Sequence, residues 1–339
     1  MQIKENISLK SYNTFHINAT ARYFTNFTSL NEVEELFSFY TTNKLTNTLI
    51  LGGGSNILFT QDFNGLVAKN DMVGIDLVKE DSDHVYIKAG AGENWHQFVL
   101  NCIKNNYAGV ENLSLIPGNV GASPMQNIGA YGVEIKDVFY ELEGYHIEDK
   151  KATTFSNKDC EFAYRESVFK KKYKDKFIIT SVTFRLNKTP QYNTSYGAIQ
   201  QELEKMGVKN LSIAAISQAV INIRQSKLPD PAVIGNAGSF FKNPTVPKAK
   251  FETLQHEFPG IVGYVVNDKE VKLAAGWMIE QCGWKGYRKG DAGCHAAQAL
   301  VLVNYDNANG IDIYNLSTEI MNSVEEKFGV FLEREVNII

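Results

Sequence analysis

The sequence lacks the features that mark several classes of protein. Its 339 residues include 34 lysines and arginines against 38 aspartates and glutamates, a net charge of −4, so no basic excess points to nucleic acid. No run approaches the ~18 apolar residues of a membrane-spanning helix. The start, MQIKENISLKSYNTF, has no apolar core of the kind found in signal peptides. We therefore expect a cytoplasmic protein that binds neither nucleic acid nor membrane. We also expect a monomer, although the sequence itself does not reveal the oligomeric state.

Cysteine is scarce as well. Cys102, Cys160, Cys282 and Cys294 are far apart in the sequence and form no C-x-x-C pair, so neither a disulfide framework nor a zinc site is indicated. Cys294 directly precedes His295, but two neighbouring residues do not supply the three or four ligands that a metal needs. We expect free thiols and no metal.

Helix and strand patterns alternate along the chain, which has no internal repeat and no low-complexity segment. Ser29 and Glu32 have the spacing of a capping box at the start of a helix. Apolar residues at helical spacing predict helices at 30–40, 95–103, 213–223, 275–282 and 320–328. Alternating or continuous apolar residues predict strands at 49–51, 85–89, 176–186, 299–303 and 331–339. This order predicts a mixed α and β protein.

Length and proline positions indicate how the chain divides. A chain of this length can form two or three domains, each with its own core. Pro229 and Pro231 mark the best internal boundary, because each lacks an amide donor and disfavours helix in the preceding residue.

Two glycine-rich segments need an explanation. LGGGSN (51–56) follows a predicted strand, and PGNVGASPMQNIGAYG (117–132) lies in a stretch, 112–133, without a charged residue. Neither has the G-x-G-x-x-G spacing of a dinucleotide-binding turn. Glycines let several backbone N–H groups approach one anion, so a neutral loop can hold a pyrophosphate. A simple tight turn is the alternative for the first segment, whereas the second is too long and too weakly apolar to be only a turn or core.

Six motifs resemble, in order, those of the UDP-N-acetylenolpyruvoylglucosamine reductase family, flavoenzymes of peptidoglycan precursor synthesis. They are PGNVGASPMQNIGAYG, FAYRESVF, KLPDP, GNAGSFFKNP, KLAAGWMIEQCGWKG and LEREV. The resemblance runs from about residue 13 to the C-terminus, and NTSYG (193–197) matches the extra segment of the family's longer form. His16, in SYNTFHI, has no assigned task.

The resemblance implies an α+β fold of three domains. Residues 1–67 and 68–228 would form an FAD-binding fold of the vanillyl-alcohol-oxidase (PCMH) type, and 229–330 a C-terminal α+β substrate-binding domain. The strand at 331–339 would rejoin the first domain.

The resemblance also implies a reaction and its ligands. NADPH would reduce UDP-N-acetyl-3-O-(1-carboxyvinyl)-glucosamine to UDP-N-acetylmuramate through non-covalently bound FAD. The residues that match FAD-binding positions are Gly52, Gly53, Gly54, Ser55, Asn56, Gly118, Gly121, Ala122, Ser123, Pro124, Asn127, Ile128, Gly129, Ala130, Gly132, Val133 and Val182. Those that match positions around the UDP-sugar are Tyr196, Lys227, Asn243, Tyr264, Lys285 and Gln298.

The chemistry of an enolpyruvyl ether gives three further residues a shared task. Hydride addition to the terminal carbon moves negative charge onto the carboxylate-bearing carbon, which must then be protonated. By resemblance, Ser239 donates that proton, Arg165 pairs with the substrate carboxylate, and protonated Glu335 hydrogen-bonds the charge-rich intermediate. Ser239 does not lie in a G-x-S-x-G nucleophile elbow.

Each of these residues also has an ordinary structural interpretation. Ser239 would be a turn serine, Arg165 would pair with Glu161 on a helix turn, and Glu335 would be a solvated carboxylate on an alternating strand. Arg224 would contact FAD or substrate, or interact with the C-terminal end of its own helix.

Two other functions remain open at this point. One is an FAD-dependent alcohol oxidase of the same superfamily, which would leave Ser239, Arg165 and Glu335 without a shared role. The other is a catalytically silent UDP-sugar binding protein.

Overall fold

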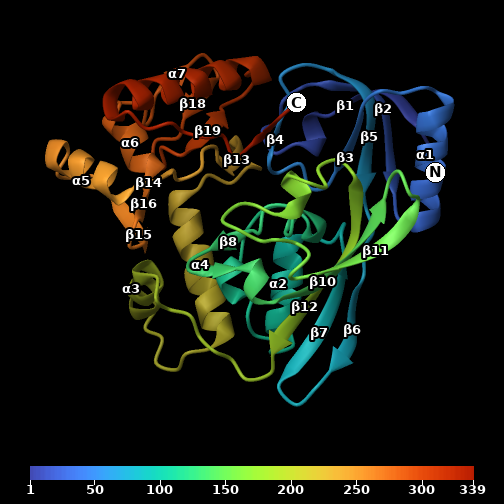
Figure 1. Ribbon diagram of the computed structural model, residues 1–339, viewed down its shortest axis with the longest axis horizontal. Coiled ribbons are helices and arrows are strands. Elements are labelled where there is room, and N and C mark those ends of the chain that lie inside the picture. Colours follow the sequence, from blue (N-terminus) through green and yellow to red (C-terminus); the bar gives the residue numbers. More distant parts are fainter. The chain divides into compact units, whose positions relative to one another are not determined.

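The computed structural model describes residues 1–339, and the chain forms two compact units (Figure 1). The first contains Met1–Ile7, Arg22–Gly53 and Asn64–Ser226, and the second contains Ser8–Ala21, Gly54–Phe63 and Lys227–Ile339. The three-domain division of the sequence stays a prediction. None of the helices combines the length and the apolar character needed to cross a membrane.

Two sheets dominate the first unit. The first sheet has the order β1 (Lys4–Ser8), β2 (Thr20–Phe27), β5 (Phe63–Asn70), β3 (Thr48–Leu51), with β3 and β5 parallel. The second is antiparallel, with the order β11 (Lys151–Ser156), β10 (Phe139–His146), β12 (Phe177–Asn187), β7 (His84–Gly90), β6 (Ile75–Glu80). A separate pair joins β8 (Gly129–Ala130) to β9 (Val133–Glu134).

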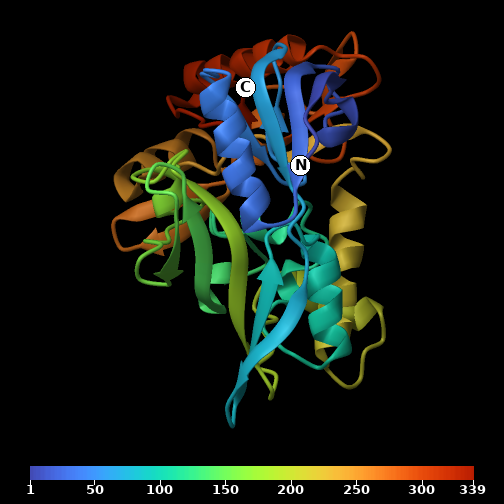
Figure 2. The ribbon, with the colours of Figure 1, turned by 90° about the vertical axis from the view of Figure 1, so that its right-hand side faces the viewer.

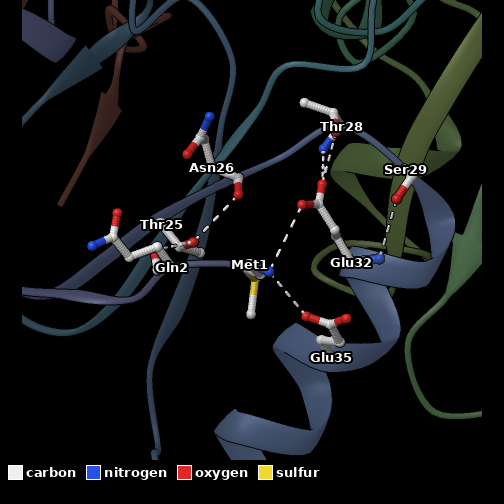
Figure 3. Close-up of polar contacts among 8 residues, drawn as sticks. All are labelled: Met1, Gln2, Thr25, Asn26, Thr28, Ser29, Glu32 and Glu35. Atoms are coloured by element: carbon white, nitrogen blue, oxygen red, sulfur yellow. Dashed lines mark hydrogen bonds and ion pairs between the residues drawn. The ribbon is translucent and has the colours of Figure 1, made fainter.

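The helix predicted after Ser29 is confirmed as α1 (Leu30–Thr42), and its first turn is drawn in Figure 3. The Ser29 hydroxyl accepts from the Glu32 N–H at 3.4 Å. The Glu32 carboxylate accepts from the Thr28 N–H at 2.6 Å, one residue earlier than a capping box requires. Hydrogen bonds from Thr28 hold the pKa of Glu32 below its ordinary value. The Met1 ammonium lies 3.1 Å from the Glu35 carboxylate (Figure 3).

Each helix of the first unit buries the apolar face that its spacing predicts. In α1, Val33 and Leu36 pack with Leu66 of β5, so the helix covers one face of the first sheet (Figures 1 and 2). In α2 (Trp95–Lys104), the rings of Trp95 and Phe98 lie 5.7 and 4.8 Å from the ring of Phe184 in β12.

Two further helices of the first unit share a small core. Ile199 of α3 (Gly197–Lys205) packs with Ile216 and Val220 of α4 (Ile213–Lys227). The last residue of α4 directly precedes LPDP, as the prolines predict.

The second unit contains two small sheets and three helices. One sheet has the order β13 (Gly235–Ser239), β19 (Val301–Asn304), β18 (Ala292–Cys294), β17 (Arg288–Lys289), and the other β14 (Thr245–Pro247), β16 (Glu270–Leu273), β15 (Gly263–Asn267). The helices are α5 (Lys248–Glu257), α6 (Ala275–Gln281) and α7 (Gly310–Phe328). Strand β20 (Asn337–Ile338) pairs in parallel with β4 (Ile57–Leu58). Single 3₁₀ turns complete the chain at η1 (Lys10–Tyr12), η2 (Glu111–Leu113), η3 (Val120–Ala122), η4 (Ile135–Asp137) and η5 (Val168–Lys170).

Two predicted elements were wrong in extent. The helix predicted at 320–328 begins ten residues earlier, at Gly310, because Asn309 and Asp312 form a capping box there. The strand predicted at 331–339 is only β20, preceded by a single bridge between Phe241 and Arg334. The segment pairs first with Phe241, after β13, and then with β4. Because its partner changes, the alternating pattern does not become one continuous strand.

Candidate active site

The two glycine segments meet within the first unit. A side chain at Gly53 would place its Cβ 2.6 Å from Asn119 Oδ1 and 3.0 Å from the Gly118 Cα, so the two loops touch where only glycine fits. Farther along the second segment, a Cβ at Gly121 would lie 2.6 Å from that of Ala91. The close approach of neighbouring chain segments therefore favours glycine at positions 53 and 121.

The end of the first segment belongs to the second unit, where it meets the C-terminus. Gly54 has φ +61°, and a Cβ there would lie 2.0 Å from the Tyr12 carbonyl oxygen. Asn56 Nδ2 donates to the Glu335 carbonyl at 3.2 Å, and Asn337 Nδ2 donates to the Asn56 carbonyl at 2.9 Å. The structure thus brings predicted cofactor residue Asn56 beside predicted catalytic residue Glu335.

The second segment is held by its own polar groups. Asn127, whose φ is 44°, donates to the Glu134 carboxylate at 3.0 Å and to the Ala163 carbonyl at 3.1 Å. The Ser123 hydroxyl is buried and makes no hydrogen bond. Val182 is also fully buried, in the core of the second sheet between Leu142 and Ala89 on the neighbouring strands.

Arg165 lies in the first unit, on a turn. The helix turn considered for Arg165 and Glu161 was wrong, because a bridge between Ala163 and Glu166 closes a tight turn there and Arg165 has φ 55°. Its Nη1 donates to the Gly129 carbonyl at 3.1 Å. The turn therefore directs the guanidinium to a predicted cofactor residue.

Ser239 ends β13 in the second unit and is partly exposed, with its Cα paired to Val301 of β19. The strand is irregular just before it: the pairing register shifts between Asn236 and Ser239, Gly238 has φ +70°, and its N–H donates to the Asn236 side chain at 2.9 Å. Glycine is favoured at such a position, since a side chain is strained in this conformation.

The C-terminal segment that carries Glu335 pairs with the residues that directly follow Ser239. The Glu335 N–H donates to the Phe240 carbonyl at 2.8 Å, and the Lys242 N–H donates to the Glu333 carbonyl at 2.9 Å. The Lys242 ammonium also forms an ion pair with the Glu333 carboxylate. We call this antiparallel contact of 240–242 with 333–335 the C-terminal ladder.

Arg334 anchors the C-terminal ladder to α7. Its guanidinium donates to the hydroxyls of Ser317 and Thr318 at 2.8 and 2.6 Å and lies 4.4 Å from the centre of the Tyr314 ring. Lys242 and Arg334 lie inside motifs that we quoted, but nothing in their spacing indicates that the two motifs pair.

The residues expected around the UDP-sugar are divided between the units. In the second unit, Asn243 Oδ1 accepts from the Ala275 N–H at 3.0 Å, and Gln298 lies against Gly276, so both reach the start of α6. Lys285 forms an ion pair of 2.9 Å with Glu280. The remaining three are Tyr264, exposed on β15, Lys227, at the end of α4, and Tyr196, which precedes α3 in the first unit.

The thiols are free, as expected, and burial raises the pKa of Cys294 to about 12. A thiol held in its protonated form is a poor nucleophile and a poor metal ligand. No cluster of three or more histidine, cysteine, aspartate or glutamate side chains is arranged to hold a metal ion.

Known proteins resemble the chain along its whole length. Residues 230–339 match the family model described as UDP-N-acetylenolpyruvoylglucosamine reductase, C-terminal domain, and residues 21–147 match that of an FAD binding domain. The chain is 52% identical to the UDP-N-acetylenolpyruvoylglucosamine reductase of Flavobacterium johnsoniae, with 100% of both chains covered. It belongs to the UDP-N-acetylenolpyruvoylglucosamine reductase family. The protein of the same name from Amoebophilus asiaticus is 51% identical, again over 100% of both chains.

A solved structure of the reductase family has the same fold. The UDP-N-acetylenolpyruvylglucosamine reductase of Thermus caldophilus superposes with a TM-score of 0.69 at 21% identity, covering 100% of this chain and 99% of that one. The expected α+β class, an FAD-binding part followed by a C-terminal domain of the reductase family, is therefore confirmed.

Proposed function

We propose that the chain is an FAD-dependent oxidoreductase that reduces UDP-N-acetyl-3-O-(1-carboxyvinyl)-glucosamine to UDP-N-acetylmuramate, with NADPH as hydride source, in peptidoglycan precursor synthesis. The observation that carries the proposal is the full-length identity of 52% to a named reductase. The C-terminal ladder supports it, because the backbone of Glu335 pairs with that of Phe240, directly after Ser239, so the two proposed catalytic residues lie on neighbouring segments. An alcohol oxidase or a silent binding protein would leave this pair without a task. Action as a monomer in the cytoplasm belongs to the same proposal.

The residues of the first unit fit FAD. The second glycine segment supplies backbone N–H groups without a competing charged side chain, which suits a pyrophosphate. The buried Ser123 hydroxyl has no partner in the chain, so a ligand group can satisfy it. Neither glycine segment contains histidine or cysteine, and we therefore propose that FAD is bound without a covalent link.

Three side chains would carry the chemistry at the substrate. When bound, FAD supplies the hydride chemistry between NADPH and the terminal carbon of the enolpyruvyl group. Arg165 would bind the substrate carboxylate through its planar fork of N–H donors. Ser239 Oγ would give its proton to the carboxylate-bearing carbon, which is basic enough for a weak acid to suffice. Glu335, protonated, would donate a hydrogen bond to the oxygens on which charge accumulates.

Turnover tests the proposed function. The purified protein should oxidise NADPH only when the enolpyruvyl UDP-sugar is present, and mass spectrometry should identify the lactyl ether as product. Oxygen consumption with an alcohol as the electron donor, with H2O2 formed and neither NADPH nor the sugar required, would identify an oxidase. Sugar binding without turnover in an FAD-loaded sample would identify a silent binding protein.

The exposed ring of Tyr196 predicts a modest and selective effect of removing its hydroxyl. Tyr196 is 44% exposed and directly precedes α3. The centre of its ring lies 5.3 Å from that of Tyr131, with the two ring planes at an angle of 89°. Tyr196→Phe keeps this ring contact and loses one hydrogen-bonding group, so we expect the KM for the UDP-sugar to rise about three- to tenfold. FAD affinity, from fluorescence titration, should stay unchanged.

Tyr192→Phe is the matched control, because Tyr192 lies in the same segment and is 40% exposed. Equal effects of the two substitutions, or a weaker FAD affinity in Tyr196→Phe, would contradict the assignment of Tyr196 to the UDP-sugar.

A further inference from the structure

Leu115 adopts a backbone conformation that leucine rarely tolerates. Its φ is 58°, in the left-handed region, where the Cβ of an L-residue crowds the following carbonyl. Such residues persist only where the surroundings fix them, and they gather at functional sites. Leu115 lies three residues before Gly118, at the entrance to the second glycine segment.

Two side chains from different helices hold the backbone of Leu115. Its N–H donates to Nδ1 of His96, on α2, at 3.0 Å. Its carbonyl accepts from Nε of Arg224, on α4, at 3.2 Å. Both main-chain polar groups of the strained residue are therefore bonded to side chains.

Backbone and indole contacts fix the chain on either side of Leu115. Nε1 of Trp95 donates to the Leu113 carbonyl at 2.9 Å, and the Trp95 N–H donates to the Gly118 carbonyl at 3.0 Å. The Val120 N–H donates to the Glu93 carbonyl at 2.8 Å. Trp95 and His96 of α2 thus make three hydrogen bonds around the start of the glycine segment, at Leu113, Leu115 and Gly118. The bond to Leu115 depends on the imidazole of His96.

The charges around His96 favour the neutral ring that this contact requires. Nδ1 can accept the Leu115 N–H only when its proton is absent. Burial, and then the positive charge of Arg224 on the facing helix α4, lower the pKa of His96. Arg224 in turn shares a hydrogen bond with the Tyr131 hydroxyl, so it contacts both the entrance and the far end of the glycine segment.

We propose that His96 is a positioning residue for FAD: together with Arg224 it holds Leu115 in the left-handed conformation and so sets the path of residues 116–118 toward the cofactor. The identity of the ligand rests on the proposed function. The geometry of the clamp, formed by His96, Leu115 and Arg224, is independent of the proposed function.

Two readouts test the clamp, one with FAD and one without. His96→Ala should weaken FAD binding by apoprotein about tenfold at about pH 7.5, because one hydrogen bond and the constraint it imposes are lost. In apoprotein alone, peptides covering 113–121 should exchange their amide hydrogens faster than in the wild type. His96→Asn, whose side-chain oxygen can accept from Leu115, should retain most of the affinity. Gln97→Ala, at an exposed neighbouring position of α2, is the matched control and should change neither readout.

Leu115→Gly separates the clamp from general damage to α2. Glycine adopts φ near 60° without strain, so it no longer needs two side chains to hold it there. Adding His96→Ala to Leu115→Gly should therefore change FAD affinity by less than about twofold, whereas the two substitutions would act additively if they were independent.

The wild type should also lose FAD affinity as the pH falls through the pKa of His96, which lies below the ordinary imidazole value of about 6.5, because protonated His96 cannot accept from Leu115. The contribution of a histidine whose pKa is lowered by folding is fully present above its unfolded pKa. This contribution to the stability of the folded form is lost as the pH falls through the folded pKa. His96→Asn should lack this component of the pH dependence.

Unchanged FAD affinity and unchanged exchange of 113–121 in His96→Ala would overturn the proposal and leave the proposed function intact. If the wild type bound no FAD, the proposed function would fail and the positioning role with it, and the exchange measurement would still show whether His96 clamps Leu115.

Discussion

Ser239→Ala is expected to slow the oxidation of reduced enzyme by the enolpyruvyl UDP-sugar ~10²–10⁴-fold, the usual contribution of a general acid. Its reduction by NADPH should proceed at the wild-type rate, because the hydroxyl is proposed to act only on the substrate. Rapid-mixing absorbance at the flavin band measures the two half-reactions separately. Ser239→Cys should recover part of the lost rate, since a thiol can also donate a proton.

Isotopes test the same assignment from the product. In deuterated water, solvent deuterium should appear at the carboxylate-bearing carbon, whereas deuterated NADPH should label the terminal carbon. Thr245→Ala, a hydroxyl removed from an exposed residue shortly after the serine, is a suitable control for the variant. Normal reoxidation of Ser239→Ala by the substrate would return Ser239 to the status of a turn residue.

Arg165→Met is expected to lower kcat/KM for the UDP-sugar on the order of 10²–10³-fold, because it leaves the substrate carboxylate without a cationic partner. Arg165→Lys should recover only part of the loss, since lysine keeps the charge but not the planar fork. Arg165 also donates to Gly129, so each variant should be assayed with saturating FAD and its FAD affinity measured alongside.

Lys171→Met is the control for lost charge in the same region, because Lys171 is 67% exposed and lies 3.6 Å from Glu166 across the surface. An exposed ion pair of this kind contributes little to the stability of the fold. A kcat/KM in Arg165→Met that matches this control would exclude Arg165 from carboxylate binding.

The sequence predicted the elements whose apolar faces are complete on their own. α1, α2 and α4 each repeat buried residues at helical spacing, and the structure confirms all three. The alternation in 331–339 was misleading because a strand also needs a continuous partner, which only β4 supplies, for Asn337 and Ile338.

The candidate site was less accessible to sequence reasoning, because its parts meet through contacts between distant segments. Motif resemblance pointed to Ser239 and Glu335 individually, but the bond from the Glu335 N–H to the Phe240 carbonyl has no local signal. The left-handed conformation of Leu115 could not be predicted for a similar reason. Leucine does not favour it, and side chains of α2 and α4 hold the residue in this conformation.

The C-terminal ladder and its bond to Asn56 have a consequence for biosynthesis. Asn56 and its partner Glu335 are separated by 279 residues. At about 5–20 residues per second, the ribosome needs on the order of tens of seconds to deliver the second partner after the first. The buried strands and helices of Asn64–Ser226 leave the ribosome well before that. A nascent chain can therefore form the core of the first unit, which is proposed to bind FAD, before Glu335 has been synthesised. At that stage it lacks the carboxyl group proposed to stabilise charge on the substrate.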